Sequence, residues 1–210
     1  ARAFDADVIA LTTHGSGGLR GFLFGRIAQQ MLQEAERPTL VARAGQRRTA
    51  PLRAPAPPQR LLVPLDGAPA SEQVLPLAWN LAQCLTAHVT LARIVPTLDR
   101  LSLSESAPAV FLPTATAALL DLERRHAAED LQRLAASAPA SLAVTTVVRQ
   151  GDVIEELARL AQQADLAVMT THGRAGLAGW LAGSVAARLL ERVTIPLLLV
   201  PVSGQEEPES

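Results

Sequence analysis

The four residues Thr170-Thr171-His172-Gly173 also occur at Thr12-Thr13-His14-Gly15, with matching neighbours on both sides, and this repeat is the main guide to the fold. The matching neighbours are Ala164, Asp165, Gly176, Leu177, Gly183 and Pro196 around the later copy, and Ala6, Asp7, Gly18, Leu19, Gly25 and Pro38 around the earlier one. Each pair of equivalent residues is 158 positions apart, so the copies align without a gap. A spacing of about one domain length predicts tandem copies of one domain.

Composition and the repeat together divide the chain into four segments. Residues 1–43 hold the earlier copy, which starts in what looks like the last part of a domain. Residues 44–58 are rich in Pro, Ala and Arg, a composition typical of an extended linker. Residues 59–202 contain a complete domain, and residues 203–210 form an acidic tail. We therefore expect a fragment of a longer tandem protein, without the front half of its first domain.

Short apolar runs alternate with amphipathic segments along residues 59–202. Strands are predicted at 61–65, 89–95, 144–149, 166–170 and 197–201, and helices at 71–86, 115–136, 153–163 and 185–192. In the earlier copy, strands are predicted at 8–12 and 39–42 and a helix at 27–36. Five strands without a regular polar face indicate an α/β fold, a doubly wound five-stranded parallel sheet with helices on both faces. Ligands bind such sheets beyond the carboxyl ends of the strands, where the strand order reverses.

Composition excludes several classes of function. Hydrophobic residues make up 49% of the 210 residues and the net charge is −1, which is typical of a soluble globular protein. The chain has no strongly basic stretch and few aromatic residues, so a nucleic-acid binder is not expected. All 19 basic residues are Arg, which excludes a P-loop lysine, a Schiff base and a lysine nucleophile.

Cysteine content and apolar run lengths bear on the compartment. A single cysteine, Cys84, excludes an intramolecular disulfide and fits a reducing, cytoplasmic setting. Because Cys84 follows Leu77 and Leu81 at helical spacing, we expect it to be a small core residue. The apolar runs are too short to span a bilayer, so no membrane contact is expected.

The segment after residues 166–170 has the features of a phosphate-binding loop. Gly173 and Gly183 let the backbone approach an anion because no Cβ intervenes. Ser184 stands at the predicted start of a helix, where it can donate to a phosphate, and Arg174 can add a charge-assisted contact. From the residues alone the ordinary alternative stays open, in which the glycines shape a turn and Ser184 caps the helix.

Two further polar residues lie at the expected carboxyl edge of the sheet. Asp66 follows the first strand of the complete domain, where it can accept a hydrogen bond from the base or sugar of a nucleoside. The alternative is a turn or helix-capping residue in Asp66-Gly67. His172 has no acidic or Cys neighbour in the sequence, which favours a structural role over acid–base chemistry.

Together these residues resemble the universal stress protein family over most of the chain. Leu62-Val63-Pro64-Leu65-Asp66-Gly67 is similar to the family's first strand with its adenine-side Asp, and Ala92-Arg93-Ile94-Val95-Pro96 is similar to its second strand. Gly151-Asp152 is similar to its ribose-side turn. The segment from Thr170 to Ser184 resembles its ATP-binding signature (Gly, two residues, Gly, nine residues, Gly, Ser or Thr), with Thr170 in place of the first Gly.

The resemblance implies an adenine nucleotide alpha hydrolase-like fold and an ATP site, with Mg²⁺ held by the phosphates. The implied nucleotide-binding residues are Pro64, Leu65, Asp66, Ile94, Gly151, Met169, Thr170, His172, Gly173, Arg174, Gly183, Ser184 and Val185. In the earlier copy Thr12 replaces the first Gly of the signature and Arg26 replaces the Ser or Thr after Gly25. The Asp-bearing strand of that copy is absent from the chain, so we expect no nucleotide there.

The last strand of each copy is short, apolar and preceded by Pro38 or Pro196. An unpaired edge of this kind invites another strand. The resemblance implies that the strand from Pro196 to Val200 joins two domains of the family, either within one chain or in a homodimer.

We interpret the chain as a stress-response module that binds ATP as a sensor or regulator. No nucleophile–base pair or metal-ligand cluster is apparent in the sequence, so we do not expect an enzyme. Two other classes stay open: a nucleotide-free interaction and dimerisation module of the same family, and a nucleotide-dependent transferase. The transferase would need a catalytic group that the sequence does not reveal.

Overall fold

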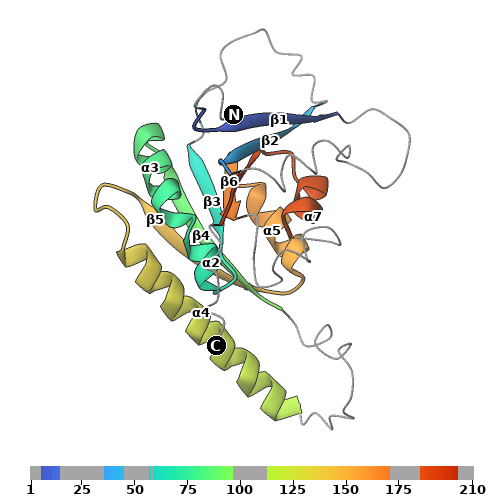
Figure 1. Ribbon diagram of the computed structural model, residues 1–210. Coiled ribbons are helices and arrows are strands. Elements are labelled where there is room, and N and C mark those ends of the chain that lie inside the picture. Colours follow the sequence, from blue (N-terminus) through green and yellow to red (C-terminus); the bar gives the residue numbers. More distant parts are fainter. Residues whose placement is uncertain are drawn as a thin grey trace, which may run out of the picture.

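A single seven-stranded sheet organises the computed structural model, which describes residues 6–14, 36–44, 57, 59–96, 113–170 and 185–202 (Figure 1). Its strands are β1 (Ile9–His14), β2 (Thr39–Ala44), β3 (Arg60–Pro64), β4 (His88–Val95), β5 (Val144–Gln150), β6 (Leu166–Thr170) and β7 (Leu197–Val200). The strand order is β1-β2-β7-β6-β3-β4-β5, and in the described residues every neighbouring pair is parallel except β2 with β7. The five-stranded parallel sheet predicted for residues 59–202 is therefore confirmed as β3 to β7.

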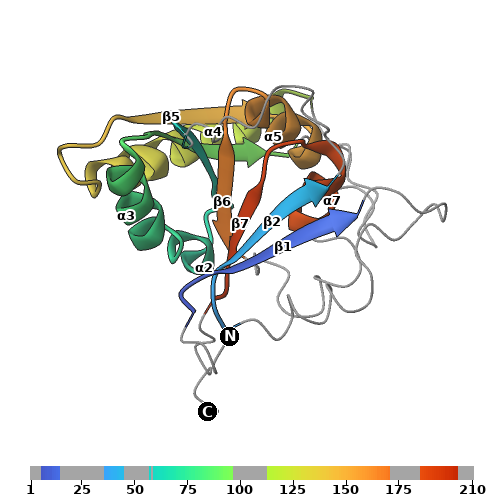
Figure 2. The same cartoon turned by 90° about the horizontal axis from the view of Figure 1, so that it is seen from above.

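Helices cover both faces of the sheet (Figure 2). On one face lie α2 (Pro69–Glu72), α3 (Leu75–Leu85) and α4 (Pro113–Ala136), and on the other α5 (Val153–Ala161) and α7 (Val185–Arg192). Trp79 of α3 and Leu131 of α4 pack against Leu61 and Val63 of β3 on the first face. Leu157 of α5 and Leu189 of α7 pack against the opposite side of the sheet, together with Leu62. Both sides of β3 are thus buried, as its continuous apolar sequence predicts.

The predicted helix at 71–86 is wrong in one respect, because it is two helices. α2 ends at Glu72 and α3 begins at Leu75, with Pro76 at the second position of α3. Proline has no N–H to donate to the carbonyl four residues earlier, which here is Glu72, so a continuous helix is disfavoured. α3 ends at Leu85 and is capped by Thr86, whose backbone is left-handed (φ 52°) and whose N–H donates to the carbonyls of Ala82 and Gln83.

Two burial predictions are also wrong. Cys84 is exposed rather than in the core, because the buried side of α3 is formed by Leu75, Ala78, Trp79 and Ala82. Strand β5 is an edge strand in the described sheet, and its side chains are half-buried or exposed rather than fully covered. The remaining predicted strands and helices lie in the described residues within a few positions of their predicted bounds, except the helix at 27–36, which lies largely outside those residues.

Strands β2 and β7 form an antiparallel junction inside the sheet. Thr39 lies opposite Leu199, Leu40 opposite Leu198, and Val41 opposite Leu197. The apolar edge that the sequence leaves on β7 is therefore covered by β2, and Val41 and Leu197 are fully buried.

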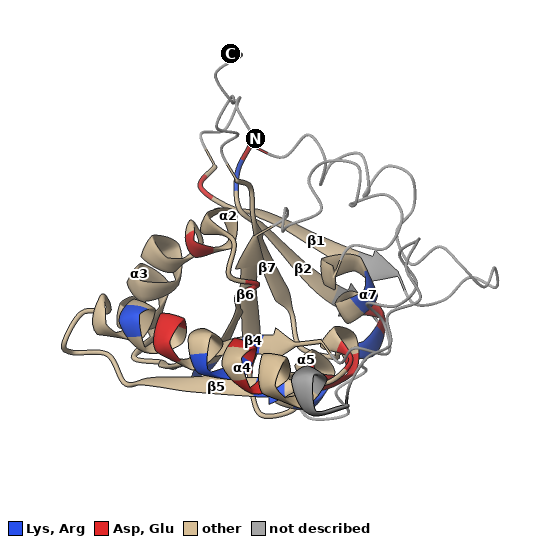
Figure 3. Cartoon of the chain, turned by 90° about the horizontal axis from the view of Figure 1, so that it is seen from below, with Lys and Arg blue, Asp and Glu red and all other residues tan. Residues whose placement is uncertain are grey.

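Charged residues of both signs are mixed along α4, α5 and α7 (Figure 3). Within α4, Arg125 pairs with Asp121 at 2.6 Å, and Arg133 pairs with Glu72 of α2 at 3.3 Å. Exposed pairs of this kind contribute at most about 1 kcal/mol each. In the described part of the chain, no helix is long and apolar enough to cross a membrane.

Candidate functional site

The strand order reverses between β3 and β6, which places the candidate site at their carboxyl ends. β3 pairs with β6 through Leu61 opposite Leu166, and on its other side with β4 through Leu61 opposite Val89. In doubly wound sheets, chain connections on the two sides of such a point lead away in opposite directions, and ligands bind beside it. Asp66 follows β3, and Thr170 is the last residue of β6.

Asp66 belongs to a tight hydrogen-bonded turn. Its carboxylate accepts a hydrogen bond from the N–H of Ala68 at 2.9 Å, and its own N–H donates to Ser71 Oγ at 3.4 Å. The hydroxyl of Ser71 donates to the carbonyl of Ala68 at 2.8 Å, which closes the turn. The turn interpretation of Asp66 is therefore confirmed, whereas the helix-capping one is wrong, because the residue before α2 is Ala68.

Pro64 and Leu65 hold this turn against the sheet. The N–H of Leu65 donates to the carbonyl of Ala92 at 2.8 Å, which continues the pairing of β3 with β4 beyond the last strand residue. The Leu65 side chain is buried in the core on the α3 face, and Pro64 is half-buried. Leu65 thus connects the Asp66 turn to β4 and to the core.

Arg93 of β4 lies against the same turn, and sequence reasoning missed it. Gly67 has φ +82°, and a Cβ added there would clash with the guanidinium of Arg93. The Arg93 side chain is only 13% exposed, and its guanidinium pairs with Asp130 of α4 at 3.0 Å. An arginine inside an apolar strand is the signal that can identify such a residue, because a buried guanidinium needs a partner.

The turn after β5 brings a second group of backbone atoms to the same edge. Gly151 has φ +147°, and its N–H donates to the carbonyl of Val95 at 3.1 Å. Asp152 caps α5, since its carboxylate accepts hydrogen bonds from the N–H groups of Ile154 and Glu155, both at 3.0 Å. This tight turn brings the start of α5 close to the end of β4.

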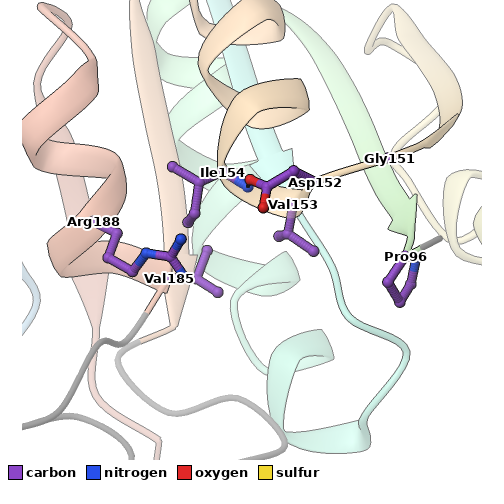
Figure 4. Close-up of a pocket in the computed structure, with 7 residues that line it drawn as sticks. All are labelled: Pro96, Gly151, Asp152, Val153, Ile154, Val185 and Arg188. Carbon is purple, nitrogen blue, oxygen red and sulfur yellow. Dashed lines mark hydrogen bonds between the residues drawn. The ribbon is translucent and has the colours of Figure 1, made fainter. Parts of the chain in front are cut away.

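A pocket of about 180 Å³ opens between this turn and α7 (Figure 4). It is lined by Pro96, Gly151, Asp152, Val153, Ile154, Val185 and Arg188. Of the predicted site residues, Gly151 and Val185 meet here although they come from different elements. The sequence prediction missed Pro96, Val153, Ile154 and Arg188. Arg188 lies three positions after Val185 on α7, and that helical spacing is the signal that predicts a shared face.

Other predicted site residues do not line this pocket. Ile94 is half-buried beside the apolar cluster under α5 and α7, and Met169 and Thr170 are buried at the end of β6. The predictions for His172, Gly173, Arg174, Gly183 and Ser184 fall outside the described residues.

The opposite edge of the sheet carries a separate ion pair that is not part of the site. At the amino ends of β3 and β6, Arg60 donates to Asp165 with a closest approach of 2.8 Å. The same carboxylate accepts from the backbone N–H groups of Gln59 and Arg60 at 3.1 and 3.0 Å. The hydrogen bond from the Arg60 guanidinium holds the pKa of the Asp165 carboxyl below its ordinary value.

The chain matches the model of the universal stress protein family over residues 1–43 and 58–201. Among solved structures, the hypothetical protein MJ0577 is similar at 18% identity and a TM-score of 0.58, over 70% of this chain and 98% of that one. UspA from Lactobacillus plantarum is similar at 21% identity and a TM-score of 0.53, over 69% and 97% respectively.

A universal stress protein from Archaeoglobus fulgidus DSM 4304 is similar over 98% of this chain and 64% of its own length, at 12% identity and a TM-score of 0.62. That match includes β1 and β2 as well as the complete domain. At these sequence identities, the similarity between the structures shows a shared fold.

Proposed function

The chain belongs to the universal stress protein family, and on that premise we propose that residues 59–202 bind an adenine nucleotide. The nucleotide is ATP, with Mg²⁺ held by its phosphates, and the module acts in the cytoplasm as a sensor or regulator in a stress response. This role matches the motif resemblance of Asp66, Gly151 and the Thr170–Ser184 segment.

One observation carries the proposal: the turn after β5 and the start of α7 meet around one pocket at the carboxyl edge of the sheet. Gly151 and Val185 line that pocket, and Asp66 follows β3 at the same edge. Ligands of doubly wound sheets bind at this edge, beside the reversal of strand order. The pocket residues therefore suit the ribose and neighbouring phosphate of a nucleotide, and Asp66 suits the base.

No catalytic role is part of the proposal. Among the described residues, no group of three or more His, Cys, Asp or Glu side chains is arranged to hold a metal ion. We assign the nucleotide a regulatory role, so turnover with any acceptor should stay below about one per second, the low end of ordinary enzyme rates. Faster turnover would favour the transferase alternative.

A second candidate function is favoured by the antiparallel junction of β2 with β7. Leu40 and Val41 of β2 pair with Leu198 and Leu197 of β7, joining residues 36–44 to the complete domain through a strand edge. This strand pairing suits an interaction or dimerisation module that acts without a nucleotide. In this alternative the two copies form a pseudo-dimer within one chain.

Calorimetry with ATP and Mg²⁺ at millimolar concentration tests the proposal. Binding is expected for the parent protein and is expected to weaken at least tenfold in Gly183→Val and Asp66→Asn. Asn keeps an oxygen for the Ala68 N–H, so it removes the charge while preserving the turn. Asp121→Asn, on exposed α4, is the matched control and should bind as the parent does.

If the parent protein gives neither heat nor a thermal shift with ATP, the nucleotide proposal is wrong and the interaction module replaces it. If Asp66→Asn and Asp121→Asn weaken binding equally, nucleotide binding stands but its assignment to this edge is wrong.

A further inference from the structure

Arg188 presents a guanidinium to the pocket from α7. Val185 and Arg188 are three positions apart on this helix, so both lie on the face that borders the pocket (Figure 4). Opposite them are the backbone of Gly151 and the side chains of Val153 and Ile154. The pocket therefore combines a mostly apolar lining with one cationic side chain.

The neighbouring arginines have carboxylate partners, and Arg188 differs from them. Arg192 of α7 pairs with Glu155 of α5, and Arg159 pairs with Glu156 within α5. No carboxylate of the described residues forms an ion pair with Arg188. Asp152, the acidic residue of the pocket, directs its carboxylate to the backbone N–H groups that begin α5. Arg188 is thus a cation beside a pocket whose acidic residue, Asp152, caps α5.

The size of the pocket limits what it can hold. Whole ligand sites measure about 300–1,000 Å³, whereas this pocket measures about 180 Å³. It therefore accommodates one part of a nucleotide rather than the whole molecule. An apolar lining suits the carbon face of a pentose, and a guanidinium suits the phosphate attached to it, because planar guanidinium groups form charge-assisted hydrogen bonds with phosphate oxygens.

We propose that Arg188 contacts a phosphate of the bound nucleotide and makes the site select phosphorylated nucleotides over nucleosides. This inference rests on the proposed nucleotide function and names a residue that the family signature does not include. Arg188 is a ligand-contacting specificity residue in this proposal and has no role in holding the adenine base.

The test compares Arg188→Gln with the control Arg192→Gln in calorimetric titrations with ATP and with adenosine. Arg188→Gln should weaken ATP binding about tenfold and change adenosine binding less than twofold, because only the phosphate contact is lost. Arg192→Gln should leave both affinities within twofold of the parent. Arg188→Lys should recover part of the ATP affinity, since it restores the charge without the planar fork.

A titration of ATP at two salt concentrations adds an independent readout. The affinity of the parent should fall more steeply with salt than that of Arg188→Gln, because an exposed charge contact is screened. Equal loss of ATP and adenosine affinity in Arg188→Gln, or no loss of either, would overturn this inference and leave nucleotide binding intact. If the parent binds neither ligand, the proposed function fails, and this inference fails with it.

Discussion

Leu40 of β2 lies opposite Leu198 of β7 at the centre of the antiparallel junction, and the two leucines are 158 positions apart. The same interval separates the two Thr-Thr-His-Gly copies. Ile9 of β1 lies opposite Thr39 of β2, and Ala167 of β6 lies opposite Leu197 of β7. The residues of the second pair follow those of the first by the same 158 positions. The pairing pattern therefore has local two-fold symmetry centred on the Leu40–Leu198 pair.

Leu198→Ala should weaken the fold because Leu198 is buried in the core on the α3 face beside Val200 and Leu166. We expect the free energy of unfolding to fall by about 2–4 kcal/mol, the cost of a cavity left by a truncated leucine. Leu40→Ala should cost less, because Leu40 is only half-buried. Urea unfolding of the two variants measures both values, and an equal loss would contradict the unequal burial.

The equivalent positions Val8 and Leu166 should respond differently to truncation. Val8 stands next to β1, at the edge of the described sheet, and is 47% exposed, whereas Leu166 lies between β3 and β7 and is 5% exposed. Leu166→Ala should cost about 2–5 kcal/mol, and Val8→Ala should change stability by less than about 0.5 kcal/mol. Chemical denaturation compares the pair, and a large loss at Val8 would indicate a covered edge.

Asp165 should make stability depend on acid pH. Hydrogen bonding to Arg60 lowers the pKa of this carboxyl in the folded state, so the contribution is present above the ordinary pKa, about 3.9, and is lost as pH falls through the lower folded value. The side chain is 34% exposed, so the contribution is partly screened. Asp165→Asn should flatten the stability profile below pH 4 in thermal melts, and Asp121→Asn serves as control. An unchanged profile in Asp165→Asn would contradict this assignment.

Gly67→Ala should destabilise the fold by about 1–3 kcal/mol, because its φ of +82° is unfavourable for alanine and the Arg93 guanidinium occupies the space. The cost should be smaller in an Arg93→Ala background, where the contact is removed and only the backbone strain remains. A double-mutant cycle in urea measures this coupling. If the two losses in free energy of unfolding are strictly additive, Arg93 does not contribute to the cost of Gly67→Ala.

Cys84 should react with a thiol reagent in the folded protein, because its side chain is exposed on α3. One equivalent of thiol should be titrated by Ellman's reagent without denaturant, at a rate similar to that of the unfolded chain. If the reaction requires denaturant, Cys84 is buried in the folded protein, as its helical spacing predicts.

Local sequence patterns predict single elements of this fold well. The bounds of β6 and α7 agree with their predicted ranges, because an unbroken apolar run and a clear amphipathic repeat need no tertiary information. The signal for the break between α2 and α3 is Pro76, because its missing N–H disfavours one continuous helix. Cys84 shows the limit of this method, since an apolar spacing of three or four does not define how wide the buried face is.

The candidate site was only partly predictable. Asp66 and Gly151 could be placed at the carboxyl edge, because parallel strands end on the same side of a sheet. Arg93 and Arg188 could not be assigned partners, because their surroundings come from α4, α5 and the turn after β3, which lie far away in the chain.

The alternation of strands and helices, the repeat with its interval of 158 residues, and the family can all be read from the amino-acid sequence. These features follow from local periodicity and from the identity of residues at matching positions. The three-dimensional structure was needed to show that β2 and β7 pair antiparallel, that Asp66 closes a turn, and that Gly151 and Arg188 line one pocket. The physical reason is that strand pairing and side-chain contacts depend on distances between remote segments, which hydrophobic spacing along the chain does not specify.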